Sequence, residues 1–113
     1  MARKIDSKTQ NGISVFLERV RSEHDVSAAY LYGSRARGDH NEESDADLAL
    51  IMRDPAKATS RFAVSLGALE FDVLMETGVF VSAMPIAEAD WKQPSSFSNP
   101  ELIAHIKRDG IAL

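Results

Sequence analysis

The stretch from Tyr30 to Met52 reads YLYGSRARGDHNEESDADLALIM and joins two apolar segments through a polar loop. The residues before Gly33 predict one strand, and those around and after Asp47 predict a second. Gly33 can adopt backbone angles closed to other residues, so a bulky anion can come close to the main chain there. A helical turn starting at Ser34 would direct free N–H groups and its positive dipole end at that anion. The first half of the stretch therefore predicts a phosphate-binding turn.

The second half of the stretch carries a pair of acids. Asp45 and Asp47 are two residues apart in an extended segment, so their carboxylates project from one face and Ala46 and Leu48 from the other. Two like charges side by side cost energy unless a positive group lies between them. A divalent cation bound by oxygen ligands is the usual solution. Asp45 and Asp47 are therefore predicted metal ligands.

Together these residues resemble a known family. Gly33-Ser34, ten intervening residues and Asp45-Ala46-Asp47 are similar to the signature of the DNA polymerase beta superfamily of nucleotidyltransferases. More narrowly, they resemble the minimal nucleotidyltransferase (MNT) proteins, which are about this length and often accompany a HEPN-domain protein. The signature covers Gly33 to Leu48. The resemblance implies an α/β, polymerase-beta-like nucleotidyltransferase fold: a small mixed sheet with helices mainly on one face and the site on the open side.

The same resemblance implies an enzyme that uses an NTP and Mg²⁺ or Mn²⁺. It would transfer a nucleoside monophosphate, with AMP from ATP the expected case, to a hydroxyl of a protein acceptor. The role would be antitoxin-like, with a HEPN-type partner. The implied catalytic residues are Asp45, Asp47 and Ser34. The implied nucleotide-binding residues are Gly33, Ser34, Arg37 and Ser44.

Several of these residues have a structural alternative. Arg37 could brace the loop by pairing with an acid, and Ser44 could cap or orient the start of the second strand. Arg35 is expected to face solvent or to pair with the acidic loop. His40 could touch a ligand, but a solvated loop residue is the simpler expectation.

A third acid is missing from its expected place. Family members commonly carry it on a later strand, whereas the strand expected over 79–84 contains no acid. Asp72 would serve as a third metal ligand if its segment were extended, but the four/three spacing of apolar residues from Phe62 favours a helix there. The alternative to an active enzyme is therefore a weak or inactive nucleotide-binding module that neutralises a toxin by contact alone.

Composition narrows the class of protein. A chain of 113 residues predicts a single domain over 1–113, and the resemblance implies that this is a nucleotidyltransferase domain. The absence of cysteine excludes disulfides and cysteine zinc sites, and the net charge of −4 argues against direct binding of nucleic acid. Without a long apolar run, we expect a cytoplasmic protein with no membrane association. The sequence leaves homo-oligomerisation open.

The apolar pattern predicts the remaining elements. Ser7 and Gln10 fit a capping box at the start of the first helix. In the helix expected over 57–77, Phe71 and Met75 lie away from the main apolar face, so this helix is either buried on two sides or packed against a partner. Pro85 is expected to close the third strand. The predicted elements are helices over 8–23, 57–77 and 100–109, strands over 26–32, 45–52 and 79–84, and a mostly irregular segment over 87–98.

Overall fold

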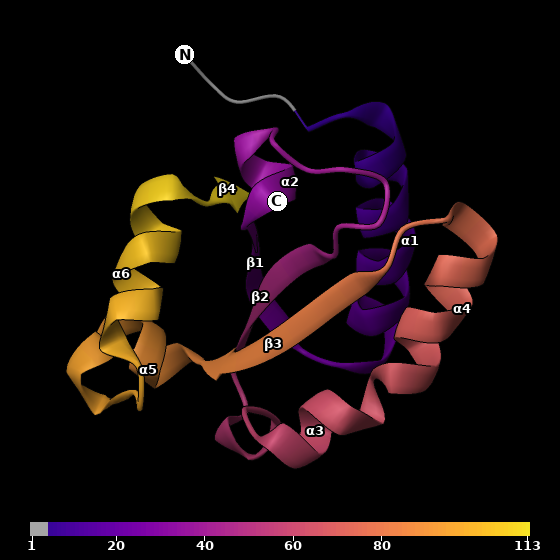
Figure 1. Ribbon diagram of the computed structural model, residues 1–113. Coiled ribbons are helices and arrows are strands. Elements are labelled where there is room, and N and C mark those ends of the chain that lie inside the picture. Colours follow the sequence, from indigo (N-terminus) through magenta and orange to yellow (C-terminus); the bar gives the residue numbers. More distant parts are fainter. Residues whose placement is uncertain (1–4) are drawn as a thin grey trace.

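The computed structural model describes residues 5–113 and contains one four-stranded sheet with the order β3-β2-β1-β4. Strand β1 is antiparallel to both β2 and β4, whereas β2 and β3 are parallel. The sheet is therefore mixed, as expected (Figure 1). Its strands are β1 (Val26–Tyr32), β2 (Ala46–Met52), β3 (Val81–Ala87) and β4 (Ile111–Ala112).

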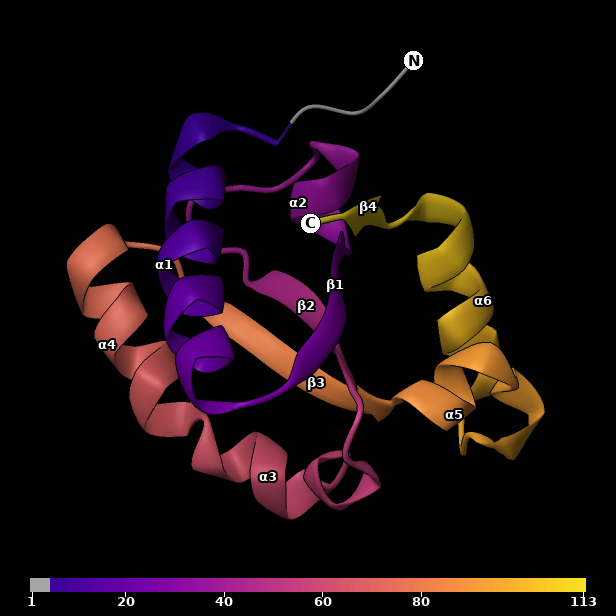
Figure 2. The same cartoon turned by 180° about the vertical axis from the view of Figure 1, so that it is seen from behind.

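One face of the sheet is covered by α1 (Ser7–Glu23), α3 (Ser60–Ser65) and α4 (Gly67–Thr77). These helices lie on the same side of the sheet in both views (Figure 2). Leu48, Leu50 and Met52 alternate along β2 and point to this side, where they are almost fully buried. The helix residues of this core include Ile13, Phe16, Val20, Phe62, Leu66 and Val73.

The opposite face is covered only in part. Helix α6 (Pro100–Asp109) buries Ile103 and Ile106 against Ala49 and Ile51 of β2. The short helix α5 (Glu88–Lys92) contributes Trp91, whose ring stacks on that of Tyr30 with 4.7 Å between the centroids. This coverage stops before Asp47, which lies on the same face as Ala49. The helices therefore lie mainly on one face, and the end of the sheet that carries the site is open.

Several boundaries differ from the predicted ones. The segment expected as one helix over 57–77 is divided into the 3₁₀ turn η1 (Pro55–Lys57), α3 and α4, and the αL residue Gly78 ends α4. Strand β3 continues through Pro85, which an edge strand tolerates because one side of its backbone needs no ladder partner. The N-cap of α1 is Asp6, which accepts a bond from Thr9 N, so the capping box expected at Ser7 is wrong.

The C-terminal part contains more regular structure than expected. The segment 87–98 forms α5 and the 3₁₀ turn η2 (Pro94–Ser96), and the residues after α6 add β4 beside β1. Asn99 caps α6 and Pro100 opens it, as the sequence predicts. Among the described residues, no helix combines the length and the apolar character needed to cross a bilayer.

Candidate active site

The glycine turn and the aspartate pair meet at the open end of the sheet. Gly33 follows β1 with φ +78°, and Asp47 lies beside the end of β1 because it pairs with Tyr32 across the sheet. A Cβ placed on Gly33 would lie only 2.5 Å from Asp47 Oδ2. A residue without a side chain is therefore required for two reasons here, the left-handed backbone and the close carboxylate.

The turn after Gly33 is the short helix α2 (Ser34–Arg37). The Gly33 carbonyl accepts bonds from the N–H groups of Ala36 and Arg37, both at 3.1 Å. Ser34 is partly buried at the first position of this turn. Arg37 lies at its exposed end, where Nε is 3.1 Å from Asp39 Oδ2. Arg37 thus pairs with an acid, the structural role that the sequence left open for it.

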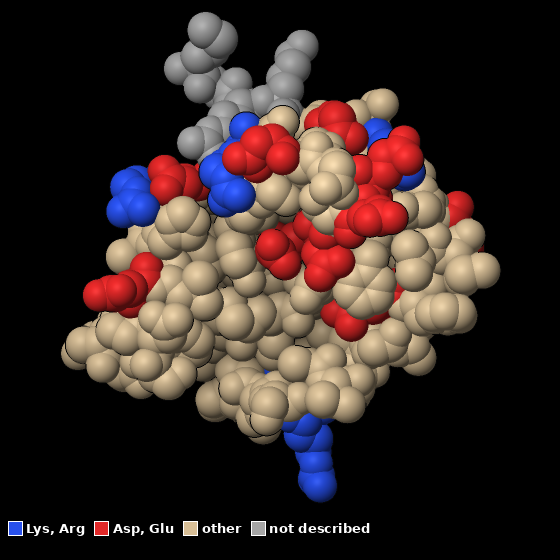
Figure 3. All heavy atoms as spheres, in the orientation of Figure 1, with Lys and Arg blue, Asp and Glu red and all other residues tan. Residues whose placement is uncertain are grey.

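Asp45 affects the ionisation of Asp47. The pKa of Asp47 is raised by burial and, less strongly, by the charge of Asp45, while the charge of Arg37 opposes the shift. Asp45 is exposed and directly precedes β2, whose first amide, Ala46 N, bonds to the carbonyl of Phe80 at 2.8 Å. The site is therefore a partly buried carboxylate beside an exposed one. Asp and Glu side chains gather over this end of β2 and β3 (Figure 3).

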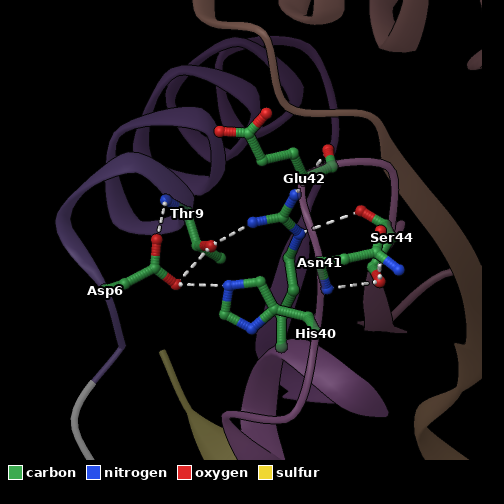
Figure 4. Close-up of polar contacts among 7 residues, drawn as sticks. Asp6, Thr9, His40, Asn41, Glu42 and Ser44 are labelled. Atoms are coloured by element: carbon green, nitrogen blue, oxygen red, sulfur yellow. Dashed lines mark hydrogen bonds and ion pairs between the residues drawn. The ribbon is translucent and has the colours of Figure 1, made fainter.

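A buried arginine, Arg35, connects the two halves of the site through bonds to Thr9 and Ser44, both labelled in Figure 4. Only 2% of Arg35 is exposed, so of its two expected environments the solvent-facing one is wrong, and the contact with the acidic loop is the one observed. Its guanidinium donates to the carbonyl of Ser44 at 2.9 Å, to Thr9 Oγ1 at 2.7 Å and to the carbonyl of Glu42 at 3.4 Å. Because Ser44 directly precedes Asp45, Arg35 holds the loop with the acids against the turn that starts at Gly33.

The loop from His40 to Ser44 is also braced by its own side chains. His40 Nε2 lies 3.3 Å from Asp6 Oδ1, and the imidazole is mostly buried rather than solvated as expected. The backbone N–H of Asn41 donates to Ser44 Oγ at 3.1 Å. The Ser44 hydroxyl therefore supports the loop, whereas the backbone carbonyl of Ser44 is the group that bonds to Arg35.

Comparison with known proteins decides the family. Residues 16–113 match the family described as "Polymerase beta, Nucleotidyltransferase". The chain belongs to this family. The resemblance carried by Gly33-Ser34 and Asp45-Ala46-Asp47 is thus confirmed, and so is the nucleotidyltransferase fold. No curated protein matches the chain.

Two solved structures resemble this nucleotidyltransferase at low sequence identity. A chain in the crystal structure of a mutant of the toxin–antitoxin pair MntA–HpeT superposes with a TM-score of 0.59 and 19% identity, covering 92% of this chain and 70% of that one. The same fold therefore occurs in that structure. A protein from Sulfolobus solfataricus assigned as a nucleotidyltransferase covers 96% of this chain and 87% of its own, with 19% identity and a TM-score of 0.49.

A carboxylate of α4, Glu70, lies near the aspartate pair without joining it in a metal-binding group. Glu70 Oε2 accepts a hydrogen bond from the backbone N–H of Ala83 at 2.8 Å. Ala83 follows Ser82 in β3, and Ser82 pairs with Asp47 of β2. Burial raises the pKa of Glu70, the bond from Ala83 opposes this, and the charge of Asp45 adds to the increase. Ser82 thus occupies the strand position beside Asp47. The sequence did not indicate Glu70, because only the packing of α4 against β3 brings it to this end of the sheet.

Asp72 is not brought to the aspartate pair. It lies in α4, two residues beyond Glu70, in a shallow groove with Arg19, Met75 and Glu76. Its charge contributes to raising the pKa of Arg19, after the stronger effect of the bond to Glu76. The extended conformation that a metal role for Asp72 requires is absent, since residues 67–77 are helical.

Tyr32 is a site residue that the sequence analysis missed. It pairs with Asp47 across β1 and β2. Burial and, to a smaller extent, the Asp47 charge raise the pKa of its phenol to about 12. The phenol therefore stays neutral at physiological pH and offers an O–H donor beside the carboxylate.

The donor set fits a hard cation shared with a substrate. Among residues 5–113, no three His, Cys, Asp or Glu side chains are grouped closely enough to hold a metal ion by themselves. Mg²⁺ is typically bound through one or two carboxylates together with water and substrate phosphates. Asp45 and Asp47 match that pattern, because they supply two oxygen ligands and repel each other without a cation between them.

Proposed function

We propose that this protein transfers a nucleoside monophosphate, AMP from ATP, to a hydroxyl group of a protein acceptor in a Mg²⁺-dependent reaction. The observation that carries the proposal is the contact of Asp47 with Gly33, with Asp45 alongside. It puts the predicted metal ligands directly against the predicted phosphate-binding turn. Mn²⁺ is expected to replace Mg²⁺, since both accept carboxylate and phosphate oxygens.

The residues have distinct roles in this proposal. Asp45 and Asp47 hold the cation, which neutralises charge on the triphosphate when bound. Gly33 lets the phosphates approach the main chain, while Ser34 and the first amides of α2 donate to their oxygens. Arg37 can leave its exposed pairing with Asp39 to donate to a phosphate. Arg35 and Ser44 keep the two halves in position, so most of the rate gain comes from orientation and charge stabilisation.

The proposed acceptor is a protein, and the proposed partner is a HEPN-type toxin. Two observations support this. The end of the sheet that carries Asp47 is left uncovered by α5 and α6. The fold is shared with a chain of a structure described as a toxin–antitoxin pair, MntA–HpeT. An antitoxin that modifies its toxin needs such an open site, because the acceptor brings its own surface.

The test is a labelling assay with the purified protein, its genomic neighbour, Mg²⁺ and each α-labelled NTP. We expect label from ATP on the neighbour and loss of at least 100-fold of the rate in Asp45→Asn and Asp47→Asn. Asp72→Asn is the matched control, since Asp72 carries the same charge away from the site, and it should keep wild-type activity. Label that persists in both site variants would contradict the assignment.

A second candidate function is a module that neutralises a toxin by contact without transfer. The observation in its favour is Ser82, which stands on β3 where an acid beside Asp47 would complete the carboxylate set. This candidate predicts a stable complex with the neighbour, no label on either protein, and a complex that survives the Asp45→Asn and Asp47→Asn changes.

A further inference from the structure

No residue of the described range 5–113 holds the side chain of Asp45 directly. The carboxylate is exposed and makes no hydrogen bond or ion pair within that range. Its position therefore depends on the backbone on either side. On one side, the N–H of Ala46 donates to the carbonyl of Phe80 at 2.8 Å and fixes the start of β2. On the other side, the position of Asp45 is set by the loop that ends at Ser44.

The last four residues of this loop form a turn that closes on itself. The N–H of Ser44 donates to the carbonyl of Asn41 at 3.2 Å, and the N–H of Asn41 donates to Ser44 Oγ at 3.1 Å. Asn41 Oδ1 accepts a further bond, from the N–H of Glu43, at 2.8 Å. Residues 41–44 therefore move as one unit. A displacement of His40, before the turn, would reach Asp45, after it.

His40 fastens the start of this turn to helix α1. Its Nε2 lies 3.3 Å from Asp6 Oδ1, and Figure 4 shows the imidazole turned toward Asp6. Only 19% of the His40 side chain is exposed. Its Nδ1 is buried and has no hydrogen-bond partner among the described residues. A side chain that only filled this space would be more favourable without such a nitrogen, so the contact of Nε2 with Asp6 is what distinguishes histidine here.

Asp6 is itself held at the first turn of α1. As the N-cap, it accepts bonds from the N–H of Thr9 at 3.1 Å and from Thr9 Oγ1 at 2.6 Å. Burial alone would raise the pKa of Asp6, but the bonds from Thr9 and, less strongly, the charges of His40 and Arg35 lower it overall. Asp6 is therefore an ionised group in a fixed position.

The turn 41–44 is tied to the start of α1 at both of its ends. At its far end, Arg35 Nε donates to the carbonyl of Ser44 at 2.9 Å, while the same guanidinium donates to Thr9 Oγ1 at 2.7 Å. Arg35 also belongs to α2 and so to the predicted phosphate-binding turn. His40 lies in the loop itself. A change at His40 therefore releases one end of the turn with the least change elsewhere.

We propose that His40 is a positioning residue for the metal ligand Asp45, acting through the turn 41–44, and that it couples cation binding to the order of the first turn of α1. This inference rests on the proposed function, because it takes Asp45 as a ligand of the cation. Coupling between two sites is reciprocal. A cation that fixes Asp45 therefore also stabilises the bonds between Asp6 and Thr9, and a change at His40 weakens cation binding.

The test is calorimetry of Mn²⁺-ATP binding to the purified protein without an acceptor, so that no transfer step is required. His40→Leu removes the contact with Asp6 and should weaken binding about 3- to 10-fold. His40→Gln keeps an N–H donor near the place of Nε2 and should stay within about 2-fold of wild type. His105→Leu is the matched control, because His105 Nδ1 also lies 3.3 Å from a carboxylate, that of Asp109, but in α6. It should bind as wild type does.

Asp6→Asn reaches the same contact from the other side. Asn caps a helix about as well as Asp does, so α1 keeps its start while the carboxylate that faces His40 is lost. Binding of Mn²⁺-ATP should weaken about 2- to 5-fold. The double variant with His40→Leu should bind no more weakly than His40→Leu alone, because both changes remove the same contact. Losses that add up in the double variant would overturn the proposal.

Urea unfolding separates positioning from a purely stabilising role. In His40→Leu an apolar side chain replaces the buried nitrogen without a partner, so the unfolding midpoint should not fall although Mn²⁺-ATP binding is weaker. If His40 only stabilised the fold, the midpoint would fall and binding would be unchanged, and this result would overturn the proposal.

The coupling to α1 is measured by hydrogen exchange of the Thr9 N–H, which bonds to Asp6. Mn²⁺-ATP should slow this exchange about 3-fold in wild type and less in His40→Leu. Exchange that Mn²⁺-ATP leaves unchanged in wild type would overturn the proposal, as would a His40→Gln variant that binds as weakly as His40→Leu. Both results leave the proposed function intact. A wild-type protein that binds no Mn²⁺-ATP would overturn the proposed function as well.

Discussion

At the site end of the sheet and on the outer surface of α4, side chains lie in environments that are unusual for their chemical type, but in opposite senses. At the site, a charged residue is buried: Arg35 is 2% exposed and has three oxygen acceptors. On α4, apolar residues are exposed, with Phe71 and Met75 facing outward. A buried charge is tolerated only when its partners are built around it. Exposed apolar side chains need no such partners, because no polar group is taken out of water.

The largest expected effect on stability comes from removing the buried cation. Arg35→Met keeps the volume but leaves Thr9 Oγ1 and the carbonyl of Ser44 without their donor, and should lower the free energy of unfolding by about 3 kcal/mol. Urea unfolding measures it. Arg35→Lys keeps the charge with fewer donors and should recover part of the loss. Equal stability of Arg35→Met and wild type would show that the network adds nothing.

The second-largest effect is expected from a side chain added at Gly33, where the two halves of the site meet. Gly33→Ala is strained at φ +78° and places a Cβ 2.5 Å from Asp47 Oδ2. It should cost about 2 kcal/mol and weaken Mn²⁺-ATP binding, measured by calorimetry, at least 10-fold. Gly38→Ala is the matched control, with φ +85° and no atom within 4 Å of the added Cβ. It should carry the backbone strain without the loss of binding.

A pair of truncations two residues apart on α4 tests the contrast directly. Val73→Ala removes a side chain that is fully buried under the sheet and should cost about 1.5 kcal/mol of unfolding free energy. Phe71→Ala removes a larger but exposed side chain and should change the stability of the monomer by less than about 0.5 kcal/mol. Thermal unfolding at low protein concentration compares the two. A larger loss for Phe71→Ala would mean that its ring packs within the monomer.

The smallest effect concerns pH. The pKa of Asp47 is raised in the folded protein, so its ionised form is less favourable there than in the unfolded chain. This penalty is absent below the ordinary pKa of 3.8, develops as the pH rises through the folded value, and then stays constant. Asp47→Asn should therefore stabilise the ligand-free protein at pH 7, by less than about 1 kcal/mol because solvent screens the half-buried group. At pH 3 the gain should vanish. A gain that is the same at both values would contradict this cause.

Much of the fold could be predicted from local pattern. The strand 26–32 matches β1, and the cap and proline at Asn99 and Pro100 mark the start of α6. The predicted boundaries of helices and strands were wrong where tertiary structure set them. Pro85 lies within β3 because that strand is at the sheet edge, a position that nearby residues do not reveal. The apolar spacing from Phe62 likewise did not show that the helix is interrupted at Leu66.

Residue types and their spacing were sufficient to locate a glycine turn, an acid pair and the family to which they belong. These features lie in short segments, where local pattern is informative. Which long side chains reach the site depends instead on packing. Arg35 turned inward and Glu70 reached β3 from α4, while Asp72 turned away. Such outcomes depend on how the helices pack on the sheet. This packing brings together residues that are distant in the chain, and the spacing of residues within one segment does not reveal it.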